Sequence, residues 1–226
     1  MVDRTLDRLP SKPDPVRLSL FNVADLTAGL KPRSYTWNVG IWLDQGREGA
    51  CVGHGWTHEA VARPVVVNSW PRPNFTATNP QAFAFELYRW AQDHDEWEGH
   101  AYDGTSVAAG AKGMVLAGCI GEYRWTHDAY DTAVAVSRSG PAVIGVDWYT
   151  GMFNPDRFGF LNLTGRVEGG HCLLVNGYSL PRKAFRLRNS WGADWGDRGE
   201  AWLRFADLVQ LLQQGGEVCI PTRRML

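Results

Sequence analysis

The stretch DQGREGACV at Asp44–Val52 places a glutamine six residues before a cysteine, and a GGH triplet ends 120 positions after that cysteine. The segment RNSWGADWG follows the triplet. Together these segments contain the side chains that a thiol hydrolase requires. Cys51 would be the nucleophile and His171 the base that takes its proton. Asn189 would orient the imidazole, and Gln45 would donate a hydrogen bond to the oxyanion.

A cysteine or a histidine taken alone is more often a buried structural residue than a catalytic one. The joint occurrence of Gln45 upstream of Cys51 with both downstream segments makes the catalytic interpretation the better one. A free thiol is mostly protonated at neutral pH, and a helix N-terminus together with an imidazolium lowers its pKa. Because Cys51 stands where a helix can begin, we expect it to have a lowered pKa and to react faster than the other three cysteines.

The composition is that of a globular protein, with 226 residues, 44% hydrophobic and 21% charged. The net charge of -1 and the lack of a basic run predict neither nucleic acid nor a membrane as partner. The first residues lack the apolar stretch of a secretory signal, and no run approaches a membrane span, so we expect a cytoplasmic protein. Four scattered cysteines indicate a reducing compartment rather than a disulfide scaffold.

Two patterns that could suggest metal binding are weak. His54 and His58 are four residues apart, but Glu59 lies outside the pair, so HGWTHE is not the zinc motif HExxH. The acidic stretch Asp93–Gly99 lacks the glycine and the terminal glutamate of a calcium loop. The sequence therefore predicts no metal site, and the catalytic residues need no cofactor.

The chain divides into a proline-punctuated N-terminal arm, residues 1–33, and a catalytic domain, residues 34–226. Within the domain, helical patterns dominate from about 45 to 130 and strand-like runs from about 131 to 226. We expect an α+β fold, with a helical lobe, a mostly antiparallel lobe and a cleft between them. The expected helices are Cys51–Val67, Asn79–His94, Thr105–Ala117 and a short one within Phe21–Leu30, and the expected strands are Ala142–Trp148, His171–Tyr178, Lys183–Asn189 and Glu200–Phe205.

From about Pro32 to Phe205 the chain resembles the papain-like cysteine peptidases. The resemblance rests on DQG before the nucleophile, on GGH, and on an ungapped NSWGxxWGxxG pattern that starts at Asn189. It implies a two-lobe papain-like fold and an endopeptidase that hydrolyses protein or peptide substrates through an acyl-enzyme. Two alternatives stay open: an amidase or transpeptidase that uses the same residues on a non-protein amide, and a non-catalytic papain-like scaffold that binds a partner protein.

The resemblance also implies roles for residues around the catalytic set. Trp191 would shield the hydrogen bond between Asn189 and His171 from water, and Trp195 would flank the leaving-group side of the cleft. The remaining candidates for substrate binding lie in a loop that pairs with substrate backbone or near the main specificity pocket: Asp103, Gly104, Thr105, Gly145 and Gly170.

The chain departs from the family pattern at several positions. Glu48 replaces a cysteine, which removes a disulfide, while Val52 and His54 replace aromatic residues. The long prosegment of secreted members is not expected, which suggests a compact bacterial or phage-type member. The arm, residues 1–33, has two interpretations: it regulates access to the cleft, with Leu18–Leu30 able to lie in a groove, or it packs against the β lobe.

Overall fold

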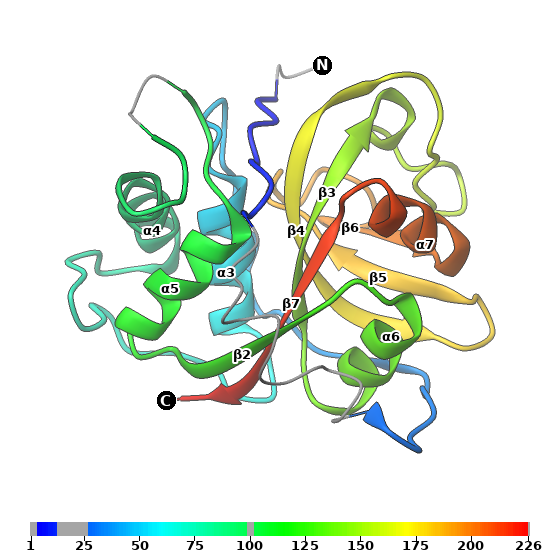
Figure 1. Ribbon diagram of the computed structural model, residues 1–226, viewed down its shortest axis with the longest axis horizontal. Helices are drawn as coiled ribbons and strands as arrows, with labels where there is room; N and C mark the ends of the chain where they lie inside the picture. Colours follow the sequence, from blue (N-terminus) through cyan, green and yellow to red (C-terminus); the bar gives the residue numbers. More distant parts are fainter. Residues whose placement is uncertain (1–3, 13–26, 99–101, 226) are drawn as a thin grey trace.

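The structure is a computed structural model that describes residues 4–12, 27–98 and 102–225. It combines helices with an antiparallel sheet, as the α+β prediction requires (Figure 1). The helices are α3 (Cys51–Val61), α4 (Pro80–Asp93), α5 (Val107–Leu116), α6 (Ala129–Arg138) and α7 (Phe205–Gln213), with a short 3-10 helix, η1 (Thr150–Met152). Helices α3, α4 and α5 form one half of the molecule, and α6 and α7 lie with the sheet in the other.

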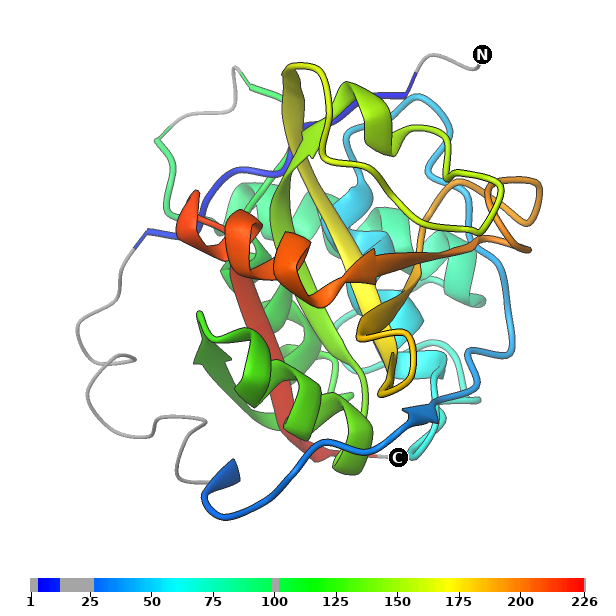
Figure 2. The same cartoon turned by 90° about the vertical axis from the view of Figure 1, so that its right-hand side faces the viewer.

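The sheet follows the order β2-β7-β3-β4-β5-β6, and β1 pairs with β4 at one end. Its members are β1 (Tyr35–Thr36), β2 (Ile120–Thr126), β3 (Ala142–Tyr149), β4 (Val167–Ser179), β5 (Ala184–Arg188), β6 (Glu200–Arg204) and β7 (Glu217–Arg224). All of these pairings are antiparallel. Viewed from the side in Figure 2, α6 and α7 lie in front of the central strands.

Alternate residues of the central strands enter two hydrophobic cores, one on each face of the sheet. Val143 of β3 joins the core that contains α3, α4 and α5, whereas its neighbour Ile144 joins the core that contains α6 and α7. Cys172 and Leu173 of β4 divide in the same way. This is the two-residue period of a strand. Because both faces are covered, the strands are continuous apolar runs rather than alternating polar and apolar ones.

Two glycines let α3 lie close to its neighbours. A Cβ atom on Gly53 would collide with the Ala84 carbonyl of α4, and one on Gly55 would lie 2.9 Å from the Sγ atom of Cys172 on β4. The glycines cost about 1 kcal/mol each relative to alanine in a helix interior. The close packing that they permit fixes α3, and with it Cys51, against the sheet.

Two of the predicted helices, α4 and α5, occur near their expected bounds. Helix α4 starts where Asn79 caps it, since the Asn79 side chain accepts a hydrogen bond from the Ala82 N–H at 2.9 Å, and Pro80 occupies the first turn. Helix α3 ends at Val61, earlier than expected, because Pro64 has no N–H with which to continue it. Of the predicted stretch Phe21–Leu30, residues 21–26 lie outside the described residues.

Six elements of the described residues were not predicted from the sequence: the longer β2, α6, α7 and β7, and the short β1 and η1. Strand β2 joins the sheet by pairing with β7, although it falls within the residues assigned to the helical lobe. The start of α6 did carry a signal, because Asp128 accepts a hydrogen bond from the Asp131 N–H as a helix cap. Residues 4–12 also do not behave as an appendage, since they pack between the two halves of the molecule (Figure 1).

A buried ion pair joins α3 to β7, and we expect its disruption to destabilise the fold. Glu59 Oε1 lies 2.7 Å from Arg224 Nε, and both side chains are buried. Burial raises the pKa of Glu59, and Arg224 opposes that effect. The Arg224→Met variant leaves a buried acid without its cation, which should lower the free energy of unfolding by about 3–5 kcal/mol. Urea denaturation measures the change, and the exposed Arg223→Met variant is the control. Equal stability of the two variants would contradict this prediction.

Candidate active site

Three of the predicted catalytic residues come together where α3 meets β4. Cys51 is the first residue of α3, His171 lies on β4, and Asn189 follows the end of β5. His171 Nε2 lies 2.8 Å from Asn189 Oδ1. The Cys172 backbone is near enough to the Cys51 thiol to favour its thiolate form, so the thiol lies beside the residue that follows the histidine.

The hydrogen bond to Asn189 determines which imidazole nitrogen is left free to take a proton. Asn189 Oδ1 accepts a second hydrogen bond from the Ser190 N–H at 2.8 Å, so this oxygen acts as an acceptor and His171 Nε2 carries the hydrogen. The other nitrogen, Nδ1, is buried and has no hydrogen-bond partner among the described residues. In the neutral ring Nδ1 is therefore the base that can take a proton.

Aromatic rings cover this histidine. The Trp191 ring centroid lies 5.0 Å from that of His171, and the Trp148 ring approaches edge-on at 4.8 Å. Trp191 has 4% of its surface exposed, which fits the predicted shielding of the imidazole. Trp195 contacts Trp191 edge-on and donates a hydrogen bond to the Phe153 carbonyl. Trp148 was not predicted, because within an apolar strand run nothing distinguishes it from an ordinary core residue.

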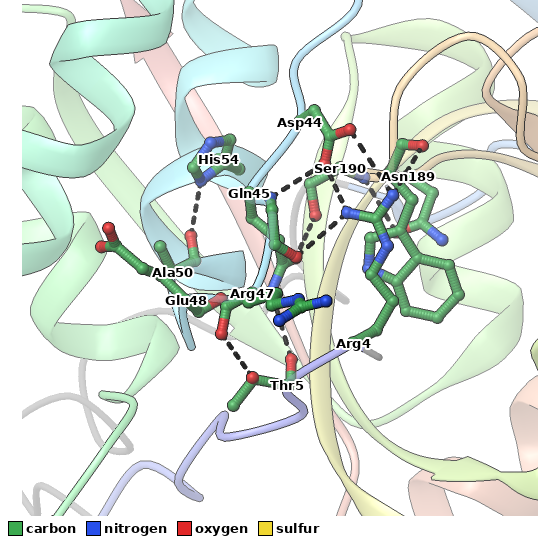
Figure 3. A network of polar contacts seen from close by, with 12 residues as sticks. Arg4, Thr5, Asp44, Gln45, Arg47, Glu48, Ala50, His54, Asn189 and Ser190 are labelled. Carbon is green, nitrogen blue, oxygen red and sulfur yellow. Dashed lines mark hydrogen bonds and ion pairs between the residues drawn. The ribbon is translucent and has the colours of Figure 1, made fainter. Parts of the chain in front are cut away.

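Gln45 is held by hydrogen bonds at both ends of its amide (Figure 3). Its Oε1 accepts a hydrogen bond from Ser190 Oγ at 2.6 Å, so the NH₂ group points the opposite way. Nε2 donates to the Glu48 carbonyl at 2.8 Å and to the Thr5 carbonyl at 3.2 Å. The predicted oxyanion donor is thus engaged by a carbonyl of the N-terminal segment, and Ser190 orients it, a role that the sequence did not reveal.

The N-terminal segment, residues 4–12, joins the two halves of the molecule beside these residues. The Arg8 N–H donates to the Gly170 carbonyl at 2.9 Å, and the Leu9 N–H donates to the Thr105 carbonyl at 3.0 Å. Figure 1 shows the segment descending between α3 and β4. It therefore contacts both the strand that carries His171 and the loop that precedes α5.

Both ends of this segment are anchored. Arg4 forms an ion pair with Asp44 and donates a hydrogen bond to the Trp191 carbonyl at 3.3 Å (Figure 3). At the other end, Lys12 Nζ lies 4.7 Å from the centroid of the Trp97 ring. Contacts with the rest of the protein extend over the whole segment, so residues 4–12 are packed as part of the folded structure.

The predicted substrate-binding residues surround the same segment. A Cβ atom on Gly104 or Gly170 would collide with the segment's backbone, and Gly145 faces one of its side chains. Burial, together with the charge of Asp103, raises the pKa of Asp7 within the segment. Five of the residues for which the sequence implied substrate binding therefore contact the N-terminal segment: Gly104, Thr105, Gly145, Gly170 and Trp191.

The Cys51 thiol and the His171 imidazole are both uncharged while the N-terminal segment is in place. Burial raises the pKa of Cys51 to about 11 and lowers the pKa of His171 to about 4, and the hydrogen bond to Asn189 only partly opposes the second shift. This contradicts the expected lowered pKa of the cysteine. The reason is desolvation, because the N-terminal segment lies over the site and both side chains are fully buried.

Both histidines of α3, His54 and His58, are buried in the protein interior. His54 Nδ1 lies 2.8 Å from the Ala50 carbonyl and Nε2 lies 3.1 Å from Gln81, and burial lowers its pKa to about 4. His58 is fully buried.

Within residues 4–12, 27–98 and 102–225, no group of three or more potential ligand side chains could hold a metal ion. Over the same residues, no helix has both the length and the apolar character needed to span a membrane.

Comparisons of sequence match only a small part of the chain. No protein-family model matches the chain. A stretch of 78 residues, 34% of the chain, is 30% identical to gamete and mating-type specific protein A of Dictyostelium discoideum, and it spans 17% of that protein.

Solved structures match over nearly the whole chain. Xylellain, a cysteine protease from Xylella fastidiosa, matches with a TM-score of 0.71 at 19% identity. The match covers 96% of this chain and 96% of that chain. Procathepsin B S9 from Trypanosoma congolense has a TM-score of 0.60 at 14% identity, with 98% of this chain and 84% of that chain covered. The proform of Amb a 11, a ragweed cysteine protease, has a TM-score of 0.57 at 14% identity, with 96% and 70% covered. The chain therefore has the papain-like fold that these cysteine proteases share.

Proposed function

We propose that this protein is a cysteine endopeptidase in which Cys51 is the nucleophile and His171 the general base and acid. The observation that carries the proposal is the placement of the thiol next to the backbone of Cys172 while His171 is oriented by Asn189 at 2.8 Å. A nucleophile, a base and a group that orients the base are the three parts that acyl transfer by a thiol requires.

In the proposed reaction, Cys51 Sγ attacks the carbonyl carbon of the scissile peptide bond after its proton passes to His171 Nδ1. The negative oxygen of the tetrahedral intermediate accepts hydrogen bonds from Gln45 Nε2 and from the Cys51 backbone N–H. His171 then gives its proton to the leaving amine as the C–N bond breaks, which leaves a thioester on Cys51. Water attacks the thioester with His171 as base, and the second product leaves as a carboxylic acid.

The contacts of the N-terminal segment support a closed, inactive state as part of this function. The Thr5 carbonyl accepts a hydrogen bond from Gln45 Nε2, which is the donor that the oxyanion would need. The segment also leaves the thiol and imidazole buried and uncharged, whereas catalysis needs a thiolate. We propose that residues 4–12 restrain the enzyme and that activity requires their displacement. This favours regulation over simple packing as the role of the arm.

Peptide cleavage by the purified protein tests the function. A mixed peptide library is incubated with the full chain and with a Cys51→Ala variant, and the products are identified by mass spectrometry. An endopeptidase is supported if peptides are cleaved at internal bonds by the full chain, or by variants with a weakened N-terminal segment, but not by the Cys51→Ala variant. If the variant cleaves equally well, or if no peptide is cleaved by the full chain or by variants with a weakened N-terminal segment, the proposal is wrong.

Replacing Gln45 should slow the chemical step. In Gln45→Ala the oxyanion loses one donor, so we expect kcat to fall by on the order of a hundredfold or more, with little change in KM. Asn189→Ala should have a smaller effect, because the imidazole loses only its orientation. Steady-state kinetics of peptide hydrolysis measures both in a chain whose N-terminal segment is loosened by Arg4→Ala and Arg8→Ala, because Gln45 also holds the Thr5 carbonyl of that segment. The exposed Gln213→Ala variant on α7 is the control. Full activity of the Gln45 variant would remove the oxyanion role.

A further inference from the structure

One amide side chain ties the residue before Gln45 to helix α4. Gln81, in the first turn of α4, holds both polar groups of the Asp44 backbone. Its Oε1 accepts a hydrogen bond from the Asp44 N–H at 3.1 Å, and its Nε2 donates one to the Asp44 carbonyl at 2.8 Å. Because Asp44 directly precedes Gln45, Gln81 fixes the backbone from which the proposed oxyanion donor extends.

A buried histidine determines how the Gln81 amide is turned. His54 Nδ1 lies 2.8 Å from the Ala50 carbonyl, which can only accept, so Nδ1 carries the hydrogen. Burial lowers the pKa of His54 to about 4, so the ring is neutral at pH 7 and its Nε2 is an acceptor. That nitrogen lies 3.1 Å from Gln81 Nε2, which donates to it. An amide turned the other way would place its oxygen against two acceptors, His54 Nε2 and the Asp44 carbonyl.

The same histidine fixes the peptide bond that precedes Cys51. The Ala50 carbonyl accepts hydrogen bonds from the His54 N–H at 3.1 Å and from His54 Nδ1 at 2.8 Å (Figure 3). A peptide group is planar, so the direction of the Ala50 C=O bond also sets the direction of the Cys51 N–H. This N–H is the second proposed donor to the oxyanion.

The two oxyanion donors are therefore connected by one series of hydrogen bonds. It runs from the Ala50 carbonyl through His54 and Gln81 to the Asp44 backbone, and each end lies one residue from a donor. The Phe85 ring packs edge-on against the His54 ring at 4.7 Å and restricts its rotation. Oxyanion donors act because they are held in place before charge develops on the substrate.

We propose that His54 and Gln81 are positioning residues for the oxyanion site, which hold the Cys51 N–H and the Gln45 amide in a fixed relation to each other. The inference rests on the proposed function and adds two residues that act through the donors without touching the substrate. The sequence did not reveal this role, since His54 was considered there only as half of a zinc motif and as the replacement of an aromatic residue.

Peptide hydrolysis by the Arg4→Ala/Arg8→Ala chain, here the parent, tests both residues. Gln81→Met keeps the length of the side chain and removes its three hydrogen bonds. His54→Phe keeps a ring against Phe85 and removes the bonds from the imidazole to Ala50 and Gln81. Each variant should lower kcat by about tenfold, part of the loss expected when a donor is removed, and change KM by less than about threefold.

The matched control is a glutamine with a side-chain hydrogen bond elsewhere in the fold. Gln214 Oε1 accepts a hydrogen bond from Tyr149 Oη at 2.9 Å, and Gln214→Met should leave kcat unchanged. Unchanged kcat in Gln81→Met or in His54→Phe would remove the positioning role of that residue.

Alkylation of Cys51 by iodoacetamide separates positioning from a general loss of structure. This reaction needs the thiolate but no oxyanion donor, so both variants should react at Cys51 within about twofold of the parent. A disrupted site would affect both reactions. A loss of kcat that is matched by an equal loss in the alkylation rate would contradict the inference.

Combination with Gln45→Ala identifies the donor through which each residue acts. When Gln45 is already alanine, Gln81→Met should lower kcat by less than about threefold, because its effect passes through the missing side chain. His54→Phe should retain a larger effect, since the Cys51 N–H is still present. A further tenfold loss from Gln81→Met in the Gln45→Ala chain would contradict its action through Gln45.

The parent chain distinguishes this inference from the proposed function. If the parent cleaves peptides and both variants match it, the positioning role is wrong and the peptidase stands. If the parent cleaves no peptide, the proposed function is wrong and the inference falls with it.

Discussion

Replacing His171 by alanine should lower kcat for peptide hydrolysis by at least about a thousandfold, within the range attributed to general acid-base catalysis. In the proposed reaction His171 acts twice, first as base toward the thiol and then as acid toward the leaving amine. Its Nδ1 atom is buried and has no hydrogen-bond partner within the described part of the chain, as a group kept free for proton transfer should be. Steady-state kinetics measures the effect, with His171→Ala and its control both made in the Arg4→Ala/Arg8→Ala chain, whose N-terminal segment is loosened.

The control for this prediction is another histidine with a defined place in the fold. His94, at the end of α4, stacks on Trp90 at 4.2 Å and is exposed. The His94→Ala variant should retain the activity of the Arg4→Ala/Arg8→Ala chain, which shows that loss of an imidazole as such does not matter. Retention of more than a tenth of the activity in His171→Ala would contradict the role of His171 as base.

Loosening the N-terminal segment should make Cys51 react faster. With the segment in place, burial raises the pKa of this thiol from 9.0 to about 11. Two pKa units correspond to about a hundredfold less thiolate at pH 7. Once water enters and the imidazole can become charged, the thiolate is favoured. We therefore expect the Arg4→Ala/Arg8→Ala chain to react with iodoacetamide at pH 7 about a hundredfold faster or more at Cys51 than the unaltered chain.

Peptide mapping by mass spectrometry assigns the label among the four buried cysteines. The exposed Arg182→Ala variant, remote in sequence from the N-terminal segment, controls for loss of positive charge. In the loosened chain the rate should stay high down to about pH 6, well below the ordinary pKa of a cysteine thiol. Equal rates at Cys51 in the unaltered and loosened chains would mean that the segment does not restrain the thiol.

The sequence was most informative where chemistry restricts the residue type. The proposed thiol chemistry needs particular residue types, and these made the segments around Gln45, Cys51, His171 and Asn189 recognisable. The structure joins His171 to Asn189, and it brings Cys51 beside the residue that follows His171. The fold class followed from hydrophobic periodicity, which placed α3, α4 and α5 and most of the sheet. These signals are local, and a single sequence displays local signals well.

What the sequence could not reveal depends on contacts between distant residues. Nothing in the local pattern pairs Arg8 with Glu217, which are 209 positions apart. The shift in the pKa of Cys51 was predicted in the wrong direction. The helix N-terminus can be read from the sequence, but the burial imposed by residues 4–12 cannot. Strand β2 was missed for a similar reason, since its pairing with β7 comes from the far end of the chain.

The most direct test of the central claim, that Cys51 is the nucleophile of a peptidase, is to trap the acyl-enzyme. The Arg4→Ala/Arg8→Ala chain is mixed with a peptide ester, quenched with acid and analysed by mass spectrometry. We predict a mass increase equal to the acyl group, located on Cys51 and absent when Cys51→Ala is added. Hydrolysis of the ester that continues at the same rate in the Cys51→Ala chain, or an acyl group found on another residue, would contradict the claim.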